Sequence, residues 1–184
     1  MIFHSRSRTK TVYFVYSGEV MLYNLTKHGN RKVIFILGKG QLLNQSIVSK
    51  KPNALFCEAV CPVKVIEIAE EQFLQLMEQS HALTRAVLRE YERNLWRMGH
   101  QLKNTTGNMQ MERKIAAKLW KLGRDFGVDT EDGVMIDIDL TITLMADLVG
   151  APRENVSRAC KVLTDRGLIR YGNKRFILTD SDGL

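Results

Sequence analysis

Cysteine is scarce in this sequence, and long apolar segments are missing from it. Cys57, Cys61 and Cys160 are the only three thiols among 184 residues. So sparse and odd a set is unlike a disulfide scaffold and is typical of the reducing cytosol, so we expect a cytoplasmic protein. No apolar run reaches the roughly 18 residues of a membrane span. The first ten residues also lack the apolar segment of a secretory signal, so we expect no membrane partner.

Patterns that carry enzyme chemistry are missing as well. The chain shows no nucleophile–base pair, no glycine-rich phosphate loop and no cluster of metal ligands at a fixed spacing. We therefore expect a protein that is not an enzyme and holds no metal. The pair Cys57-x-x-x-Cys61 is compatible with a redox function, but two buried structural thiols on adjacent strands are the favoured interpretation.

Charge is distributed unevenly along the C-terminal part of the chain. The net charge of +7 is compatible with nucleic-acid binding but is weak support for it. Residues 125–147 hold seven acidic side chains and no lysine or arginine, whereas residues 149–177 hold seven basic side chains and two acidic ones. One compact basic segment therefore follows an acidic one, as expected of a surface that meets phosphate at one edge.

The N-terminal part of the chain has the pattern of short strands. Residues 11–68 alternate in hydrophobicity, are rich in β-branched and aromatic side chains, and are divided by turns at Ser17-Gly18, at residues 27–30 and between Gly38 and Gly40. This spacing predicts a β-sandwich or a barrel-like roll. The period becomes helical at Glu70, and a short helix is predicted over residues 70–79.

A long helix is predicted over residues 81–106, where no proline interrupts the pattern. Alternating spacings of four and three give it a coiled-coil seam. The seam consists of Thr84, Leu88, Tyr91, Leu95, Met98, Leu102 and Thr105. Packing of this face against its own domain is the alternative. We prefer a dimer, because Val87 and Trp96 offer a second apolar strip that can pack on the roll and leave the seam free for a partner. A hinge is predicted after the helix, at residues 105–108.

The remaining segment predicts a helix-turn-helix followed by a hairpin. An amphipathic helix over residues 109–126, an acidic loop and a short strand over 134–138 come first, and a hairpin over 168–180 comes last. Between them, residues 142–161 match the helix-turn-helix pattern. Ala146 is small where the helices touch, Gly150 suits a positive φ in the turn, and Pro152 suits the first turn of the second helix. The expected inward positions are Met145, Val149, Ala151, Val156 and Ala159.

The second helix of this motif carries a dense polar face. Arg153, Glu154 and Arg158 are predicted to contact base edges, because arginine donates two hydrogen bonds to guanine and glutamate accepts one from cytosine. The residues predicted to contact phosphates or to support the base contacts are Asn155, Ser157, Lys161 and Lys174. A solvated face on a purely structural helical hairpin is the alternative.

The order of the predicted elements resembles that of the bacterial cyclic-AMP receptor protein/FNR (Crp/Fnr) superfamily: a roll, a long helix, a hinge and a winged helix-turn-helix. The stretches that carry the match are TVYFVYSGEV, the helix over 81–106, ERKIAAKLWKL, LVGAPRENVSRACKVLTDRGLI and the wing. Glu154, Ser157 and Arg158 also have the E-x-x-S-R form of the FNR branch. The resemblance implies a transcription regulator that binds double-stranded DNA as a homodimer and contacts RNA polymerase. It further implies a palindrome with half-sites of TGTGA or TTGAT type.

The sequence departs from the family in its sensor region. Family members begin tens of residues earlier, so the roll is expected to lack its N-terminal strands. The family's nucleotide cassette has a Gly-Glu pair and an Arg-Ser pair, but Gln45 stands in place of the acid and Asn53 in place of the arginine. An effector other than cyclic AMP is therefore expected, if there is one. The candidate pocket residues are Asn44, Gln45, Asn53, Gly99 and His100.

Cofactors suggested by other family members find little support in this sequence. There is no N-terminal cysteine cluster, so the resemblance implies no iron–sulfur centre. Cys61-Pro62 and His100 are similar to haem ligands in some family sensors, but a lone helical histidine is a weak signal, and the cofactor stays unassigned.

The sequence thus predicts an α+β protein with a truncated cyclic-nucleotide-binding-like β-roll over residues 1–80, a dimerisation helix over 81–106 and a winged helix-turn-helix over 107–184. The predicted function is sequence-specific transcription regulation as a homodimer. The alternative is a dimeric module that senses a small molecule, haem or redox state and uses its winged helix for protein contacts; salt-dependent DNA binding separates the two.

Overall fold

The computed structural model describes residues 1–105 and 110–180, with the side chains of residues 102–105 outside the description. The chain forms two compact units. The first contains Met1–Gly29 and Val33–Lys103, and the second contains Asn30–Lys32 and the chain from Asn104 onward. None of the described helices is long and apolar enough to cross a membrane.

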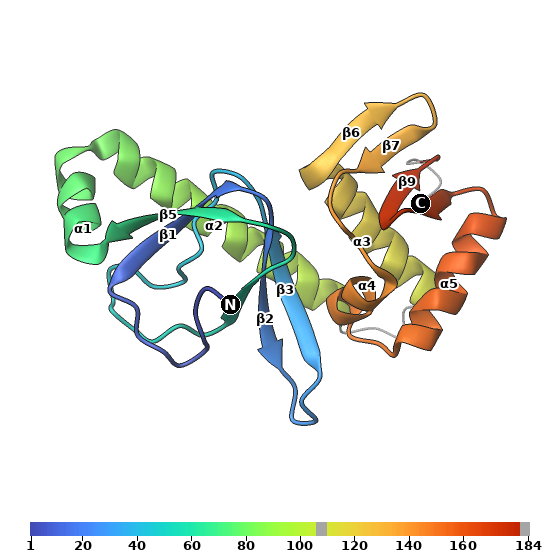
Figure 1. Cartoon of the computed structure of the whole chain (residues 1–184), viewed down its shortest axis with the longest axis horizontal. Coiled ribbons are helices and arrows are strands. Elements are labelled where there is room, and N and C mark those ends of the chain that lie inside the picture. Colours follow the sequence, from blue (N-terminus) through green and yellow to red (C-terminus); the bar gives the residue numbers. More distant parts are fainter. Residues whose placement is uncertain (106–109, 181–184) are drawn as a thin grey trace. The chain divides into compact units, whose positions relative to one another are not determined.

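The first unit combines two small antiparallel sheets with two helices (Figure 1). Its elements are β1 (Thr11–Ser17), β2 (Val20–Leu25), β3 (Arg31–Leu37), β4 (Phe56–Ala59), β5 (Lys64–Ala69), α1 (Glu70–Gln79) and α2 (His81–Thr105). β1 pairs with β5, and β2 lies between β3 and β4. The strand pattern, the short helix and the long helix predicted from the sequence are confirmed. The predicted hinge beyond Thr105 lies outside the described residues.

The turn between β1 and β2 depends on glycine at position 18. Gly18 has a φ of +79°, and a Cβ added there would lie 2.5 Å from the carbonyl oxygen of Pro62. Glycine meets both demands because it has no Cβ. The predicted break at Ser17-Gly18 is therefore a tight turn that lets β2 begin at Val20.

The N-terminal segment contributes a strand-like bridge to the roll. Phe3 pairs with Cys57 of β4: the Cys57 N–H donates to the Phe3 carbonyl at 3.0 Å, and the Ile2 N–H donates to the Cys57 carbonyl at 2.8 Å. Phe3 is 3% exposed and belongs to the core of the roll. That core consists of Phe3, Val15, Val20, Leu22, Phe35, Leu37, Leu43 and Cys57. These side chains fill the centre of the roll.

Helix α2 packs on the roll through one face only. Val87 is 4% exposed in a second cluster with Val12, Leu42, Ile47 and Phe73, and Tyr91 packs against it. Trp96, in contrast, is 54% exposed, so its prediction as part of the roll-facing strip is wrong. Nine residues separate it from Val87, and at about 100° per residue this places the two side chains on opposite sides of the helix. The Trp96 ring instead lies against His100, with ring centroids 3.9 Å apart.

The second unit surrounds a four-stranded antiparallel sheet of order β6-β7-β9-β8. Its elements are α3 (Met111–Phe126), β6 (Gly127–Thr130), β7 (Gly133–Ile136), α4 (Ile142–Val149), α5 (Arg153–Asp165), β8 (Ile169–Gly172) and β9 (Arg175–Leu178). Its core is built by fully buried side chains that come from α3, α4, α5 and β9. These are Ile115, Leu119, Met145, Val156 and Phe176.

Strand β6 corrects the prediction of an acidic loop after α3. All four of its residues are exposed, so it lacks the alternation that marks a strand in sequence. Main-chain pairing with β7 holds it instead, from Gly127 opposite Ile136 to Thr130 opposite Gly133. The Thr130 hydroxyl donates to the Gly133 carbonyl at 2.6 Å and closes the hairpin.

Candidate nucleic-acid interface

Helix α4 and the turn after it fix the direction of α5. The Thr141 hydroxyl caps α4 by accepting a hydrogen bond from the Leu144 N–H at 3.1 Å. At the other end, Gly150 adopts a left-handed conformation with a φ of 72°, and its N–H donates to the Ala146 carbonyl at 2.8 Å. The small residue and the glycine predicted for a helix-turn-helix therefore end α4 as expected.

Helix α5 has an apolar face inside the unit and a polar face outside it. Val156, Ala159, Cys160 and Leu163 are buried. Every polar residue predicted on the opposite face is exposed: Arg153, Glu154, Asn155, Ser157, Arg158 and Lys161. Pro152 is the residue just before the helix and not its first turn, while Val149 and Ala151 are only half-buried. The buried face holds the helix while the polar face stays available to a partner.

Asn155 orients one of the predicted base-contacting residues. Its side-chain oxygen accepts a hydrogen bond from the Arg158 guanidinium at 2.9 Å, one helical turn away. The Arg158 Nε also donates to the Glu154 carbonyl at 3.4 Å. These two bonds draw the guanidinium back along the helix, a detail that the spacing of the residues alone does not reveal.

The hairpin of β8 and β9 forms the predicted wing. Asn173 and Lys174 both have positive φ values, 49° and 59°, which is the conformation of a type I′ hairpin turn. Behind the turn, Arg175 forms ion pairs with Asp139 at 2.6 Å and with Asp137 at 3.5 Å. The Lys174 ammonium lies 4.0 Å from Asp139 with its side chain 62% exposed. The wing therefore presents Lys174 beside an acidic neighbour.

The seam residues of α2 differ in their exposure. Leu88, Leu95 and Met98 are 54%, 71% and 45% exposed. Tyr91 is half-buried against the roll, where its hydroxyl donates to the Asn44 carbonyl at 3.3 Å. The side chain of Leu102 lies outside the described residues. Three apolar side chains are thus left uncovered along one side of α2.

The five candidate pocket residues differ in their exposure and in their hydrogen-bond partners. Asn44 is 5% exposed and accepts from the Tyr13 N–H at 2.8 Å while donating to the Thr11 carbonyl at 2.9 Å. Asn53 is 4% exposed; its N–H donates to the Ser7 carbonyl and its own carbonyl accepts from the Arg6 N–H. Gln45 donates to the Leu43 carbonyl.

The other two candidates, Gly99 and His100, are exposed on α2. The described residues contain no group of three His, Cys, Asp or Glu side chains placed to hold a metal ion.

An exposed aromatic side chain on α3 was not predicted from the sequence. Trp120 is 49% exposed, and the Arg124 guanidinium lies 5.4 Å from the centre of its ring. The arginine four residues later was the available signal, because residues at this spacing are neighbours on a helix surface. Such a pair is typical of a cation–π contact at an exposed site.

Known proteins resemble this chain over both units. The cyclic nucleotide-binding domain family matches residues 1–80, and the Crp-like helix-turn-helix domain family matches residues 113–184. The CRP-like cAMP-activated global transcriptional regulator of Mycobacterium tuberculosis is 24% identical over 94% of this chain and 77% of its own length. The global nitrogen regulator of Nostoc sp. is 25% identical over 95% of this chain and 79% of its own length.

Solved structures agree on the fold. FixK2 from Bradyrhizobium japonicum superposes with a TM-score of 0.84 at 19% identity, covering 99% of this chain and 89% of its own. A CRP-family regulator from Thermus thermophilus gives a TM-score of 0.79 at 18% identity, with the same coverage of both chains. The two domain families, their order and these relatives place the chain in the Crp/Fnr superfamily of DNA-binding transcription regulators.

Proposed function

We propose that the protein binds a palindromic operator as a homodimer and inserts α5 of each copy into the major groove. The observation that carries this proposal is the division of α5 into a buried face and an exposed face that bears Arg153, Glu154 and Arg158. Recognition helices place base contacts near their N-termini, which is where Arg153 and Glu154 lie. The protein then acts as a cytoplasmic regulator rather than as an enzyme.

The exposed groups of α5 match the chemistry of base pairs and phosphates. The two arginines each offer a planar fork that donates two hydrogen bonds to guanine, and Glu154 accepts one from cytosine. Asn155 positions the Arg158 fork through its 2.9 Å hydrogen bond. Ser157, Lys161 and Lys174 suit phosphate contacts, which fix the orientation of the protein without reading sequence.

Dimerisation through α2 explains the apolar side chains that the single chain leaves exposed. Leu88, Leu95 and Met98 lie along a heptad seam and are 45–71% exposed. Two copies packed by this seam cover these side chains and relate the two α5 helices by two-fold symmetry. The half-sites are then expected about 34–36 Å apart, one turn of DNA. RNA polymerase is the proposed further partner on DNA.

Cyclic AMP is not the proposed effector, although some relatives carry the description cAMP-activated. A cyclic phosphate buried in a roll needs a counter-charge, since burial of an unpaired charge is costly. Asn53 carries no charge and is bound to the backbone of the N-terminal segment. Asn44 is likewise engaged by Tyr13 and Thr11. Calorimetric titration with cyclic AMP should give no heat, and micromolar binding would contradict this part of the proposal.

The test of the DNA contact compares Arg158→Ala with Arg113→Ala. Arg113 is an exposed arginine on α3 and serves as the charge-matched control. On a selected operator, Arg158→Ala should weaken binding by about 1–3 kcal/mol and relax the preference at one G·C pair. Equal loss on all sequences would make Arg158 a phosphate contact. If the unmodified protein bound no DNA at any salt concentration, the winged helix would serve protein contacts instead.

A further inference from the structure

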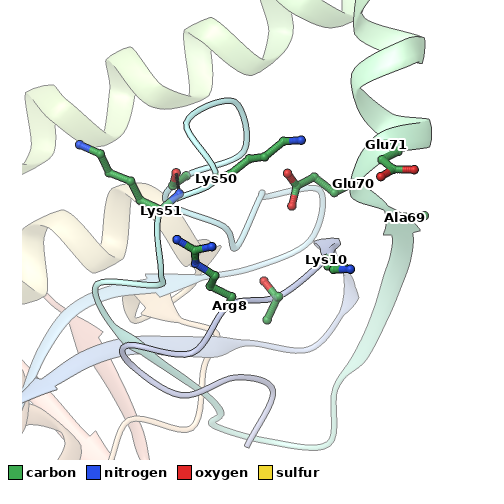
Figure 2. Close-up of a pocket in the computed structure, with 9 residues that line it drawn as sticks. Arg8, Lys10, Lys50, Lys51, Ala69, Glu70 and Glu71 are labelled. Carbon is green, nitrogen blue, oxygen red and sulfur yellow. Dashed lines mark hydrogen bonds between the residues drawn. The ribbon is translucent and has the colours of Figure 1, made fainter.

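A cavity of about 390 Å³ opens on the first unit (Figure 2). Three segments that are distant in sequence line it: the residues just before β1, the loop that contains Ser46, Lys50 and Lys51, and the start of α1. We propose that this cavity binds a phosphorylated small molecule of about the size of a sugar phosphate. The site does not depend on the operator binding proposed above.

Positive charge dominates the cavity. Arg8, Lys10, Lys50 and Lys51 line it, against Glu70 and Glu71. In the described part of the chain, none of these four basic side chains forms an ion pair. The two carboxylates offset only part of this positive charge, and an anion placed beside the basic side chains gains several charge-assisted hydrogen bonds. A phosphate monoester brings nearly two negative charges at neutral pH.

The loop that carries the two lysines is held in place by its own hydrogen bonds. The Ser46 hydroxyl lies 2.7 Å from the Ser49 hydroxyl and accepts from the Lys51 N–H at 3.1 Å. Lys50 adopts a left-handed conformation with a φ of 51°, which a residue with a Cβ rarely adopts. The backbone beneath both ammonium groups is thus fixed before a ligand arrives.

The opposite wall is joined to the same framework. The Asn44 side chain donates to the Thr9 hydroxyl at 3.5 Å and to the Thr11 carbonyl at 2.9 Å. Thr9 lies between the two basic residues Arg8 and Lys10 and also lines the cavity. One buried asparagine therefore links the segment just before β1, which contains Arg8 and Lys10, to the segment that leads into the lysine loop.

The carboxylates restrict which anions fit. Figure 2 shows Glu70 reaching from α1 toward the cavity, while Arg8 and the lysine loop lie across from it. A carboxylate accepts hydrogen bonds from hydroxyl groups and repels a second anion. A ligand with a phosphate at one end and hydroxyls at the other meets both walls, whereas an anion charged all round does not. The volume lies within the roughly 300–1,000 Å³ of small-molecule sites.

Calorimetric titration of the full chain tests this site with ribose 5-phosphate, inorganic phosphate, ribose and citrate as probes. Ribose 5-phosphate should bind most tightly, and ribose should give no heat. Lys50→Gly should weaken ribose 5-phosphate binding about tenfold or more, since it removes one charged donor. Glycine suits the positive φ at this position, so folding is not threatened. Lys39→Ala, which removes an exposed lysine outside the cavity lining, should leave binding unchanged.

Glu70→Gln separates recognition of the sugar from recognition of the phosphate. The variant should bind inorganic phosphate more tightly and narrow the advantage of ribose 5-phosphate over it. The proposal is overturned if the unmodified protein binds no ribose 5-phosphate, or if Lys50→Gly binds it as tightly as the unmodified protein does. Citrate that binds as tightly as ribose 5-phosphate would overturn the assigned ligand class.

Discussion

Leu95→Glu isolates the contribution of the α2 seam to dimerisation. Leu95 is 71% exposed in the single chain, the most exposed of the described seam residues. A charged residue there has free access to water in the monomer, so the folding free energy should change by no more than about 0.5 kcal/mol. The effect of the substitution should therefore fall on association alone.

The size of the effect follows from the surface that Leu95 still has to bury. Full burial of a leucine side chain contributes about 1.5–3 kcal/mol, so two copies that each still expose 71% of Leu95 contribute about 2–4 kcal/mol to the dimer. Two unpaired carboxylates in the seam add several kcal/mol of cost. The dimer should weaken by about a hundredfold to a thousandfold or more.

Sedimentation velocity at micromolar concentrations measures this change directly. The matched control is Leu76→Glu, because Leu76 is a 46% exposed leucine on α1 and lies outside the seam. The control should sediment as the unmodified dimer, and Leu95→Glu should sediment as a folded monomer whose circular-dichroism spectrum matches that of the unmodified protein. A Leu95→Glu protein that remained dimeric would place the interface elsewhere and refute the reasoning.

Three further predictions concern buried or strained positions. Burial raises the pKa of Cys57 to about 12 and that of Cys160 to about 11. A thiol reagent added to the native protein at about pH 8 should therefore modify Cys61 alone, and rapid modification of Cys57 would contradict its burial. Lys174→Gly should stabilise the protein by about 1 kcal/mol by relieving a φ of 59°, while weakening DNA binding; a lower melting temperature would contradict this. Asn44→Leu leaves the Tyr13 N–H and the Thr11 carbonyl without their side-chain partner, so it should lower the free energy of unfolding by about 2–4 kcal/mol in a denaturant titration. An unchanged free energy of unfolding would mean that water replaces the amide.

Side-chain periodicity predicted the elements that bury one face. Helix α5 could be read from sequence because Val156, Ala159 and Leu163 recur on one side and are buried, while charged residues fill the other. Strand β6 could not, because its four residues are all exposed, and main-chain hydrogen bonds to β7, together with the Thr130 hydroxyl, hold it in place. Trp96 was misplaced because its large apolar ring suggested burial, although its angular position on α2 opposes that of Val87.

Features assembled from distant segments lay beyond sequence reasoning. The cavity gathers Arg8, Lys50 and Glu70 from three parts of the chain that share no local pattern. The engagement of Asn44 by Tyr13 and Thr11 depends equally on the fold, since 31 residues separate Asn44 from Tyr13. The sequence shows that these side chains are polar. Which of them already have hydrogen-bond partners within the protein depends on how β1 packs beside the segment that contains Asn44.

Selection of bound duplexes from a random pool is the decisive test of operator recognition by a pair of α5 helices. The unmodified protein is mixed with the duplexes, and the retained sequences are determined. We expect a motif with two-fold symmetry whose half-sites are about one helical turn apart, with G·C pairs where the α5 arginines reach. Enrichment of a single asymmetric site, or no enrichment over the starting pool, would contradict recognition by a symmetric pair of α5 helices.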